Sequence, residues 1–370
     1  MDWDSKGGIE MDKKWLEVYE KLVNTDTSFE LSIEEKLDAT QFVADILKDM
    51  GFEVSRGRAS HVAKMGDPPR VTLIGHLDTV FKRGEPSRRP FRVEEGVVKG
   101  PGVGDMKGGV VIMLMALEEV LQGSKNLPLE VVLNVDEETG SDLGREDHLE
   151  AAKRSVFCLS FETGRKNGAV VIARKGIASL TVNISGRAGH ASSPKSGANA
   201  LIEMADKVLK VSELSSRFER LTIVPTIASS GYKGNVIPDN AYIFFDVRYS
   251  ALEEVKRLRT LLEDIFMSKR VEECEGYYAL EIRRPPMKRD EKAVKLLEDV
   301  MRYLRVQYKM LEVGGGGDAA FYSQEGVPAI DGLGIVGRYI HSEKEEAYLD
   351  WVQPRVSLSI ALLQRLIEMV

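Results

Sequence analysis

Three short apolar runs and one long apolar segment dominate the first half of the chain. The runs are VTLIG (71–75), LEVVLNV (129–135) and SVFCLSF (155–161), and DMKGGVVIMLMALEEVLQG (105–123) lies between the first two. Continuous apolar strands are typical of parallel sheets buried on both faces, and a helix that is apolar around its circumference is also buried. We therefore predict an α/β domain of βαβ units, whose largely parallel sheet is covered by helices on both faces.

The pattern of apolar positions changes between residues 176 and 285. Alternating strands and amphipathic helices follow one another there in the order βαββαβ, which is typical of a ferredoxin-like α+β unit. Helical spacing returns in 292–309 and 356–370. The pattern predicts one domain made of residues 1–175 and 286–370, with a second domain, 176–285, inserted into it.

Residues 11–50 show the spacing of two amphipathic helices. The second is predicted over SIEEKLDATQFVADILKDMG (32–51), where Ser32 is a start signal and Gly51 a stop signal.

Composition and charge narrow the range of functions. The 370 residues are 43% hydrophobic, enough for a sizeable core, and the net charge of −7 argues against nucleic acid or an anionic membrane as the main partner. The two cysteines, Cys158 and Cys274, have no paired spacing, so we expect neither a disulfide framework nor a thiolate metal site. No secretory h-region and no apolar run of transmembrane length occur, and we expect a cytoplasmic protein.

Polar side chains that can bind a metal follow each apolar run. Ligands of parallel sheets bind beyond the carboxyl ends of the strands, so these side chains are expected to meet there. Crowded carboxylates repel one another unless a cation holds them, and with imidazole among them the set suits Zn²⁺, Mn²⁺ or Co²⁺ better than Ca²⁺. Each of these residues, taken alone, has an ordinary alternative: a surface acid, a residue of a solvated loop or a helix N-cap. The residues are His76 and Asp78, then Asp136, Glu137 and Glu138, then Glu162, with Asp105 at the start of the buried helix.

Six ordered motifs resemble the M20 metallopeptidase family, a group of dizinc amidohydrolases. They are GHLDTVF, GPGVGDMKGG, DEETGS, FETG, SGRAGHASSP and YIHSEKEEAYLD, and GGGGDAAFYSQEGVPAIDGLG adds a likeness to the glutamate carboxypeptidase branch. The resemblance covers roughly residues 60–355. It implies an aminopeptidase-like, three-layer α/β/α catalytic domain with an inserted ferredoxin-like lid that also forms a homodimer.

The resemblance also implies roles for the polar residues. His76 would bind one Zn²⁺, Asp78 would orient its ring, and Asp105 would bridge both ions. Glu138 and His341 would complete one site, Glu162 would complete the other, and Glu137 would be the general base. The bond between Asp105 and Met106 is a candidate cis peptide. Two Zn²⁺ carry +4 against −3 from Asp105, Glu138 and Glu162, which leaves +1 for a bridging hydroxide; Co²⁺ or Mn²⁺ are substitutes.

Four residues of the inserted domain are also expected at the site. The resemblance implies that His190 crosses to the partner subunit and stabilises the oxyanion, against the alternative of an ordinary loop histidine. Asn235, Arg248 and Arg284 match positions that contact the substrate carboxylate or support the site, and Arg suits a carboxylate because its planar fork binds it bidentately. The alternatives are pairing of Arg248 with a neighbouring acid and a surface position for Arg284.

Five further residues have predicted places. Asp136 is predicted to be structural, because alternation along the strand turns it away from Glu137. Asp318 is predicted to hold its glycine-rich loop, and His61 and His148 are predicted to lie on the surface. For Glu345 two alternatives stay open, orientation of a neighbour of the ligands or a solvated run of charge.

Three functions remain in competition. The first is a dizinc exopeptidase or dipeptidase of the glutamate carboxypeptidase type, which hydrolyses an amide bond beside a free carboxylate in a small peptide. The second keeps the chemistry but takes N-acyl amino acids, as a deacylase of the acetylornithine or succinyl-diaminopimelate type. The third is a metal-binding protein without activity, which has no need for an unliganded base at Glu137. Nucleotide binding is rejected, because GVGDMKGG places an aspartate where a pyrophosphate would lie and GGGGD lacks the Lys and Ser/Thr of a P-loop.

Overall fold

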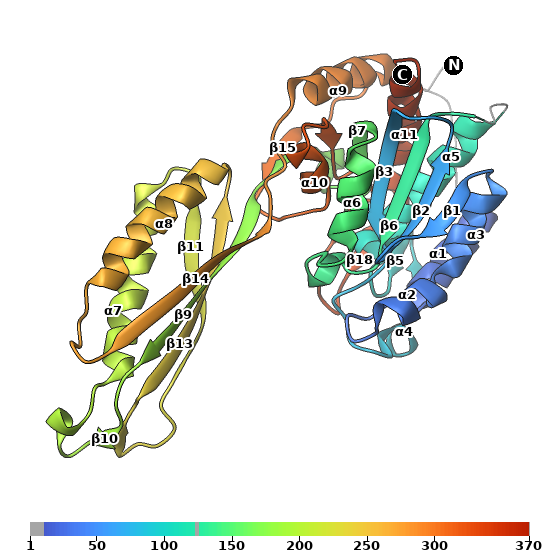
Figure 1. Cartoon of the computed structure of the whole chain (residues 1–370). Helices are drawn as coiled ribbons and strands as arrows, with labels where there is room; N and C mark the ends of the chain where they lie inside the picture. Colours follow the sequence, from blue (N-terminus) through green and yellow to red (C-terminus); the bar gives the residue numbers. More distant parts are fainter. Residues whose placement is uncertain (1–10, 123–125, 370) are drawn as a thin grey trace. The chain divides into compact units, whose positions relative to one another are not determined.

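The computed structural model describes residues 11–122 and 126–369 (Figure 1). The chain divides into two compact units. The first contains Met1–Ala173, Met287–Val313 and Gly317–Val370, and the second contains Arg174–Pro286 and Gly314–Gly316. The short glycine segment joins the second unit through Arg174, whose Nη1 donates to the carbonyl of Gly316 at 2.7 Å.

A six-stranded sheet forms the centre of the first unit. Its order is β1-β2-β6-β3-β7-β16, in which β6, β3, β7 and β16 are parallel, while β1 and β2 form an antiparallel edge. The three apolar runs of the sequence are the neighbouring strands β6, β3 and β7, so the predicted parallel core is confirmed. The strands are β1 (Glu53–Arg56), β2 (Ser60–Met65), β3 (Arg70–His76), β6 (Leu129–Asn134), β7 (Ser155–Ser160) and β16 (Ala329–Ile330).

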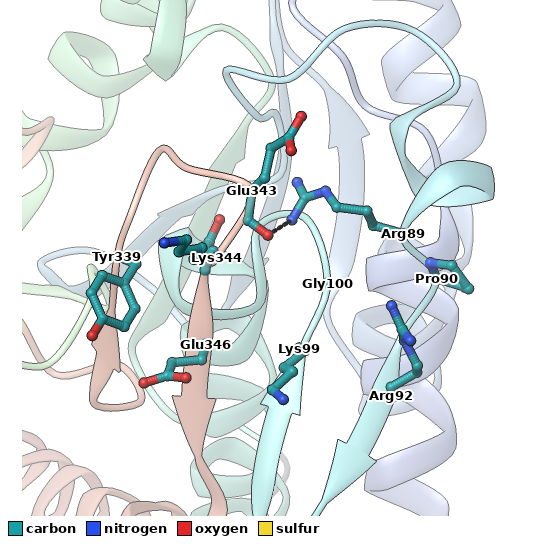
Figure 2. A pocket seen from close by; sticks show the side chains of 10 residues that line it. Arg89, Pro90, Arg92, Lys99, Gly100, Tyr339, Glu343, Lys344 and Glu346 are labelled. Atoms are coloured by element: carbon teal, nitrogen blue, oxygen red, sulfur yellow. Dashed lines mark hydrogen bonds between the residues drawn. The ribbon is translucent and has the colours of Figure 1, made fainter.

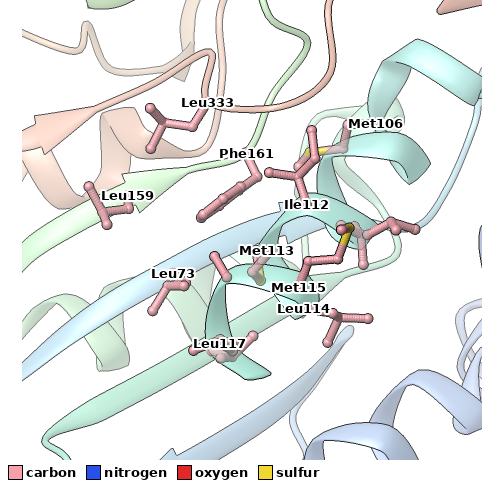
Figure 3. Packing of buried hydrophobic residues seen from close by; sticks show 14 of the residues in the cluster. Leu73, Met106, Ile112, Met113, Leu114, Met115, Leu117, Leu159, Phe161 and Leu333 are labelled. Atoms are coloured by element: carbon pink, nitrogen blue, oxygen red, sulfur yellow. The ribbon is translucent and has the colours of Figure 1, made fainter. Parts of the chain in front are cut away.

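Helices cover both faces of this sheet, as the α/β/α prediction requires (Figure 1). Successive residues of β3 point to opposite faces: Leu73 belongs to the core beneath α5, whereas Ile74 belongs to a separate core beneath α6 and α10. Figure 3 shows Leu73, Leu159 and Phe161 around Met113 of the buried helix α5. The helices are α1 (Lys13–Asn24), α2 (Ile33–Ala39), α3 (Gln41–Asp49), α4 (Glu85–Arg88), α5 (Gly108–Leu121), α6 (Gly144–Ala152), α9 (Glu291–Leu304), α10 (Ala319–Gln324) and α11 (Val352–Ile367).

Two smaller sheets complete the first unit. One has the order β17-β18-β5-β4, and the other pairs β15 with β8. Their strands are β4 (Arg92–Glu94), β5 (Val97–Lys99), β8 (Val170–Arg174), β15 (Met310–Val313), β17 (Gly337–Arg338) and β18 (Glu346–Tyr348).

The second unit has the predicted βαββαβ order. Its four main strands form an antiparallel sheet in the order β11-β13-β9-β14, with α7 and α8 packed on one face. Alternate residues of β13 are buried under these helices, from Ala241 to Tyr249, which explains the alternation in the sequence. Its elements are β9 (Gly176–Ser185), β10 (Gly189–His190), α7 (Ala200–Glu213), β11 (Thr222–Ser230), β12 (Val236–Ile237), β13 (Asn240–Tyr249), α8 (Leu252–Met267) and β14 (Glu275–Arg284).

The prediction of one helix over 32–51 is wrong, because Thr40 separates α2 from α3. The Thr40 hydroxyl donates to the carbonyl of Lys36 at 2.7 Å and lies 3.0 Å from His61 Nε2. A threonine that bonds back to the preceding turn competes with the helix. His61 is fully buried, so its predicted surface position is also wrong.

We expect stability to fall in acid because of His61. Burial lowers the pKa of His61 from 6.5 to about 4, so the folded protein resists a proton that the unfolded chain accepts. The neutral His61 therefore makes its full contribution to the free energy of unfolding above pH 6.5. As the pH falls from 6.5 towards 4, this contribution falls by up to about 3 kcal/mol. Urea midpoints of the wild type and of His61→Gln, measured from pH 7 to pH 4, check this. The wild type is expected to lose stability more steeply, and parallel profiles would contradict the assignment.

Within residues 11–122 and 126–369, no helix combines the length and the apolar composition needed to cross a bilayer.

Candidate metal centre

The carboxyl ends of β3, β6 and β7 bring acidic and imidazole side chains to one edge of the central sheet. His76 is the last residue of β3 and is in register with Asn134, the last residue of β6. Glu137 and Glu138 follow β6 in a short 3₁₀ turn, and Glu162 lies two residues beyond β7. Parallel pairing therefore accounts for the meeting of three segments that are far apart in the sequence.

Asp105 reaches this edge from the turn that precedes α5. Its backbone is not helical, with φ −119° and ψ 96°, and the cis peptide expected between Asp105 and Met106 is confirmed. Gly109, in the first turn of α5, explains how closely this helix start approaches the sheet. A Cβ at Gly109 would lie 1.9 Å from the carbonyl oxygen of Phe161, so only glycine fits there.

His341 comes from the loop between β17 and β18. It has a positive φ of 63°, and its side chain is 51% exposed, whereas that of His76 is 2% exposed. The two imidazoles therefore differ in exposure: His341 is half exposed, whereas His76 is buried in the fold.

The two oxygens of Asp105 face two different groups of side chains. Oδ1 lies 3.4 Å from His76 Nε2, and this nitrogen lies 3.8 Å from Glu162 Oε1. Oδ2 lies 3.0 Å from His341 Nε2, which lies 3.3 Å from Glu138 Oε1. The side chains of Asp105, Glu138 and Glu162 are at most 12% exposed. One carboxylate thus stands between two imidazole and carboxylate pairs.

Glu137 is also close to this group. Ligand atoms of His76, Glu137 and Glu162 all lie within 4.8 Å of one another, as do those of His76, Asp105 and Glu138. Two overlapping sets of the described residues can therefore hold a cation, and the first contains the residue that was expected to act as the base.

The electrostatics show an excess of negative charge. Burial opposes protonation of His76, but its contacts with Asp105 and Asp78 outweigh burial and raise its pKa well above the usual value. Contacts with Asp105 and Glu138 raise the pKa of His341 to about 10, and burial raises that of Glu138 to about 7. The carboxylates around both imidazoles therefore favour positive charge at the cluster.

The residues present fit a pair of divalent cations. Asp105 Oδ1 is buried and accepts no hydrogen bond from the residues that the structure describes, so it has a lone pair directed at the cluster. Mixed imidazole and carboxylate donors are typical ligands of Zn²⁺, Mn²⁺ and Co²⁺.

Asp78 holds both the imidazole and the acidic turn. Its Oδ1 lies 3.3 Å from His76 Nδ1 and accepts the backbone N–H of Glu137 at 3.2 Å, and its Oδ2 accepts that of Glu138 at 3.0 Å. The Asp78 side chain is fully buried. One carboxylate therefore sets the orientation of a ring and the position of two neighbouring acids.

Asp136 and Asp318 accept hydrogen bonds from residues on either side of the turn that carries Glu137 and Glu138. Asp136 Oδ2 accepts the N–H groups of Leu143 and Gly144, which confirms its structural role. Asp318 accepts hydrogen bonds from Ser141 Oγ and Asn134 Nδ2, both at 2.6 Å. The glycine-rich segment 314–318 therefore ends in a side chain that anchors the loop after Glu138.

The predicted surface position of His148 is wrong. This histidine is fully buried, its Nε2 lies 3.0 Å from Asp318 Oδ2, and its ring stacks on Phe321. The polar sequence around His148 gave no sign of this network, because its partner is 170 residues further along the chain.

The four predicted residues of the second unit form two pairs. His190 in β10 pairs with Val236 in β12, and the N–H of Ala191 donates to the carbonyl of Asn235 at 3.0 Å. His190 and Asn235 are both exposed. These two residues lie on neighbouring segments beyond the end of β9 at Ser185.

Arg248 and Arg284 lie near the other end of β9. Both are in register with Ile177, on either side of it, about 26 Å along the strand from Ser185 at 3.3 Å per residue. Arg248 donates to Asp246 at 2.7 and 2.9 Å, which is the alternative of pairing with a neighbouring acid. Arg284 is 4% exposed, so its alternative surface position is wrong.

Comparisons with known proteins agree with this arrangement. Residues 72–365 match the model of Peptidase family M20/M25/M40. Carboxypeptidase G2 of Pseudomonas sp. (strain RS-16) is 33% identical over 90% of this chain and 84% of its own length. Succinyl-diaminopimelate desuccinylase 2 of Shewanella loihica is 27% identical over 90% and 95%.

A solved structure shares the fold. It is a Bacillus subtilis protein described as a dinuclear metal binding peptidase from the M20 family, with a TM-score of 0.70, 15% identity and coverage of 96% of this chain and 98% of its own. The family model matches far more than half of the chain, and the predicted resemblance is confirmed. The chain belongs to peptidase family M20 and is a hydrolase of the M20 metallopeptidase type.

Proposed function

We propose that this hydrolase uses two Zn²⁺ to cleave an amide bond beside a free carboxylate, as a glutamate carboxypeptidase-like exopeptidase or dipeptidase. The observation that carries the proposal is the position of Asp105, whose two oxygens face His76 on one side and His341 on the other. His76 and Glu162 would hold one ion, Glu138 and His341 the other, and Asp105 both. A metal pair supplies a water of lowered pKa and a Lewis acid for the scissile carbonyl. Co²⁺ and Mn²⁺ are the expected substitutes.

The residues around the metal ligands would carry the proton and hold the geometry. Glu137 would take the proton of the attacking water and return it to the leaving nitrogen, because it lies beside the ligands and is held by its backbone. Asp78 would keep the His76 ring in one orientation, since it contacts Nδ1 and leaves Nε2 facing Asp105.

The second unit would supply the residues that bind the substrate. The guanidinium of Arg284, with Arg248 as its neighbour across β9, would bind the substrate carboxylate. His190 and Asn235, at the far end of β9, would act in the active site of a partner subunit. The separation of the two pairs along one strand supports this division, because it is too great for one small substrate to span.

A homodimer through the second unit follows from that division. β11 is an edge strand of its sheet, and its side chains Val224 and Ile227 are 51% and 56% exposed. Exposed apolar residues at an unpaired strand edge favour pairing with another chain. A cytoplasmic location fits the two cysteines, which are buried and unpaired.

A deacylase is the second candidate, because a desuccinylase is similar over nearly the whole chain. A panel of dipeptides with C-terminal glutamate and of N-acetyl and N-succinyl amino acids separates the two, with Zn²⁺, Mn²⁺ or Co²⁺ added. Turnover of the dipeptides is the expected result. Turnover of N-acyl amino acids alone would favour the deacylase. Two bound ions without turnover of any member would favour a metal-binding protein without activity.

Removing the metal is expected to abolish turnover of whichever substrate the panel identifies. Dialysis against a chelator such as 1,10-phenanthroline should leave the fold intact by circular dichroism, because the sheet and both cores lie outside the ligand cluster. Adding back Zn²⁺ or Co²⁺ should restore the rate, with two ions per chain by elemental analysis. Full activity after verified metal removal would contradict the metal role.

A further inference from the structure

Glu345 lies within a charged surface segment but turns inward. The segment 343–346 lines an open surface cavity of about 400 Å³, where Arg89 Nη1 donates to the carbonyl of Glu343 at 2.8 Å (Figure 2). Glu343 has a side chain that is 67% exposed, whereas Glu345 is 1% exposed. A buried carboxylate in an exposed segment needs partners that compensate its lost hydration.

Those partners are backbone groups of the turn that carries Asp105. Glu345 Oε2 accepts the N–H of Gly102 at 3.1 Å, and Oε1 accepts those of Gly104 at 2.9 Å and Asp105 at 3.0 Å. The turn bends sharply here, with φ of +74° at Gly102, which brings the three donors round one carboxylate. Buried N–H groups without an acceptor are costly, so the turn depends on this side chain.

Two further hydrogen bonds hold the turn that carries Asp105. Thr163, next to Glu162, donates to the carbonyl of Gly104 at 3.0 Å, and the Tyr19 hydroxyl donates to the carbonyl of Val103. Glu345 therefore accepts a hydrogen bond from the N–H of the peptide between Gly104 and Asp105. The carbonyl of the same peptide accepts one from Thr163, the neighbour of the proposed ligand Glu162.

The loop of residues 341–345 thus contacts Asp105 twice. His341 Nε2 lies 3.0 Å from the side-chain oxygen Oδ2, and Glu345 holds the backbone N–H. Because the backbone of Asp105 sets where its two oxygens point, a change at Glu345 would move both at once. His341 alone contacts only one of them.

We propose that Glu345 is a positioning residue that aims the carboxylate of Asp105 between His76 and His341. The inference rests on the proposed function, because it assigns the cluster as the place where metal binds. The sequence left two alternatives for Glu345, orientation of a neighbouring residue or a solvated run of charge. The proposal favours the first.

Metal titration of Glu345→Ala tests this without reference to activity. Loss of such a supporting carboxylate is expected to raise the Kd of at least one Co²⁺ ion about 10- to 100-fold, measured by competition with a chromophoric chelator. Glu345→Gln keeps an acceptor for Gly104 and Asp105 but turns a donor towards Gly102, so an increase of about tenfold is expected. Glu343→Gln is the matched control, and its Kd should stay at the wild-type value.

The visible spectrum of bound Co²⁺ separates positioning from a general loss of stability. A changed ligand geometry alters the shape of the d–d bands, whereas a merely structural role lowers the melting temperature of the metal-free protein and leaves the bands unchanged. Wild-type Kd values and bands in Glu345→Gln, or in a folded Glu345→Ala, would overturn the inference. Failure of the wild type itself to bind two ions would overturn the proposed function instead.

Discussion

Glu137→Ala is expected to lower kcat at least a hundredfold while both metal ions stay bound. General-base contributions are typically 10²- to 10⁴-fold, and the expected loss is of that size because no other carboxylate has this role in the proposed mechanism. The backbone of residue 137 is held by Asp78, so the substitution should leave the acidic turn in place. Steady-state kinetics with the substrate found by the panel, together with the metal content of the same sample, measure the two quantities.

Two control variants define the result for Glu137. Asp142→Ala, in the exposed part of the same loop, should retain the wild-type rate and metal content. Glu138→Ala should lose both rate and metal, because Glu138 faces His341. A loss of one ion from Glu137→Ala would show that Glu137 is a ligand, as its place beside His76 and Glu162 permits.

His190→Ala is expected to lower kcat about 10²- to 10³-fold, the usual effect of losing one oxyanion donor. His190 is exposed, and its Nδ1 lies 2.7 Å from Ser192 Oγ. The substitution should leave the melting temperature unchanged, because the ring packs against no core. Kinetics and calorimetry on the same preparation check both statements.

Mixed dimers test whether His190 acts in the partner subunit. A dimer of His190→Ala with Glu137→Ala contains one complete site if the histidine crosses, and none if it stays. Equal mixing with free exchange should therefore recover about a quarter of wild-type activity, since about half the dimers are mixed and each has one site. Light scattering of the wild type measures whether it is a dimer, and Ser196→Ala, on the same loop, is the matched control. No recovery in verified mixed dimers would contradict the crossing.

The main buried strands and helices were predictable because burial leaves a pattern of apolar positions in the sequence. Strands buried on both faces need continuous apolar runs, so 71–75, 129–135 and 155–161 were predicted as strands of a largely parallel sheet. In the structure these three strands are neighbours. The alternation in the second unit marked a sheet with helices on one face. The polar residues at the strand ends followed, because parallel strands end at one edge.

The sequence did not predict the buried polar contacts of Thr40, His61 and His148. At the break between α2 and α3 the Thr40 hydroxyl bonds back to Lys36, and it also lies 3.0 Å from Nε2 of His61, 21 residues away. His148 lies in a polar segment, and Asp318 accounts for its burial. Local pattern cannot report such pairs, since hydrogen bonds between distant residues leave no periodicity.

The segment around Glu345 shows both what the sequence predicts and what it does not. The letters HSEKEEAYLD identify a histidine of a family motif but leave open whether Glu345 orients a neighbouring residue or belongs to a solvated run of charge. The sequence by itself determined which residue types gather at the sheet edge, because strand burial and chain order control that. Only the tertiary structure decided which carboxylate turns inward, because the three N–H groups it accepts belong to a turn some 240 residues earlier.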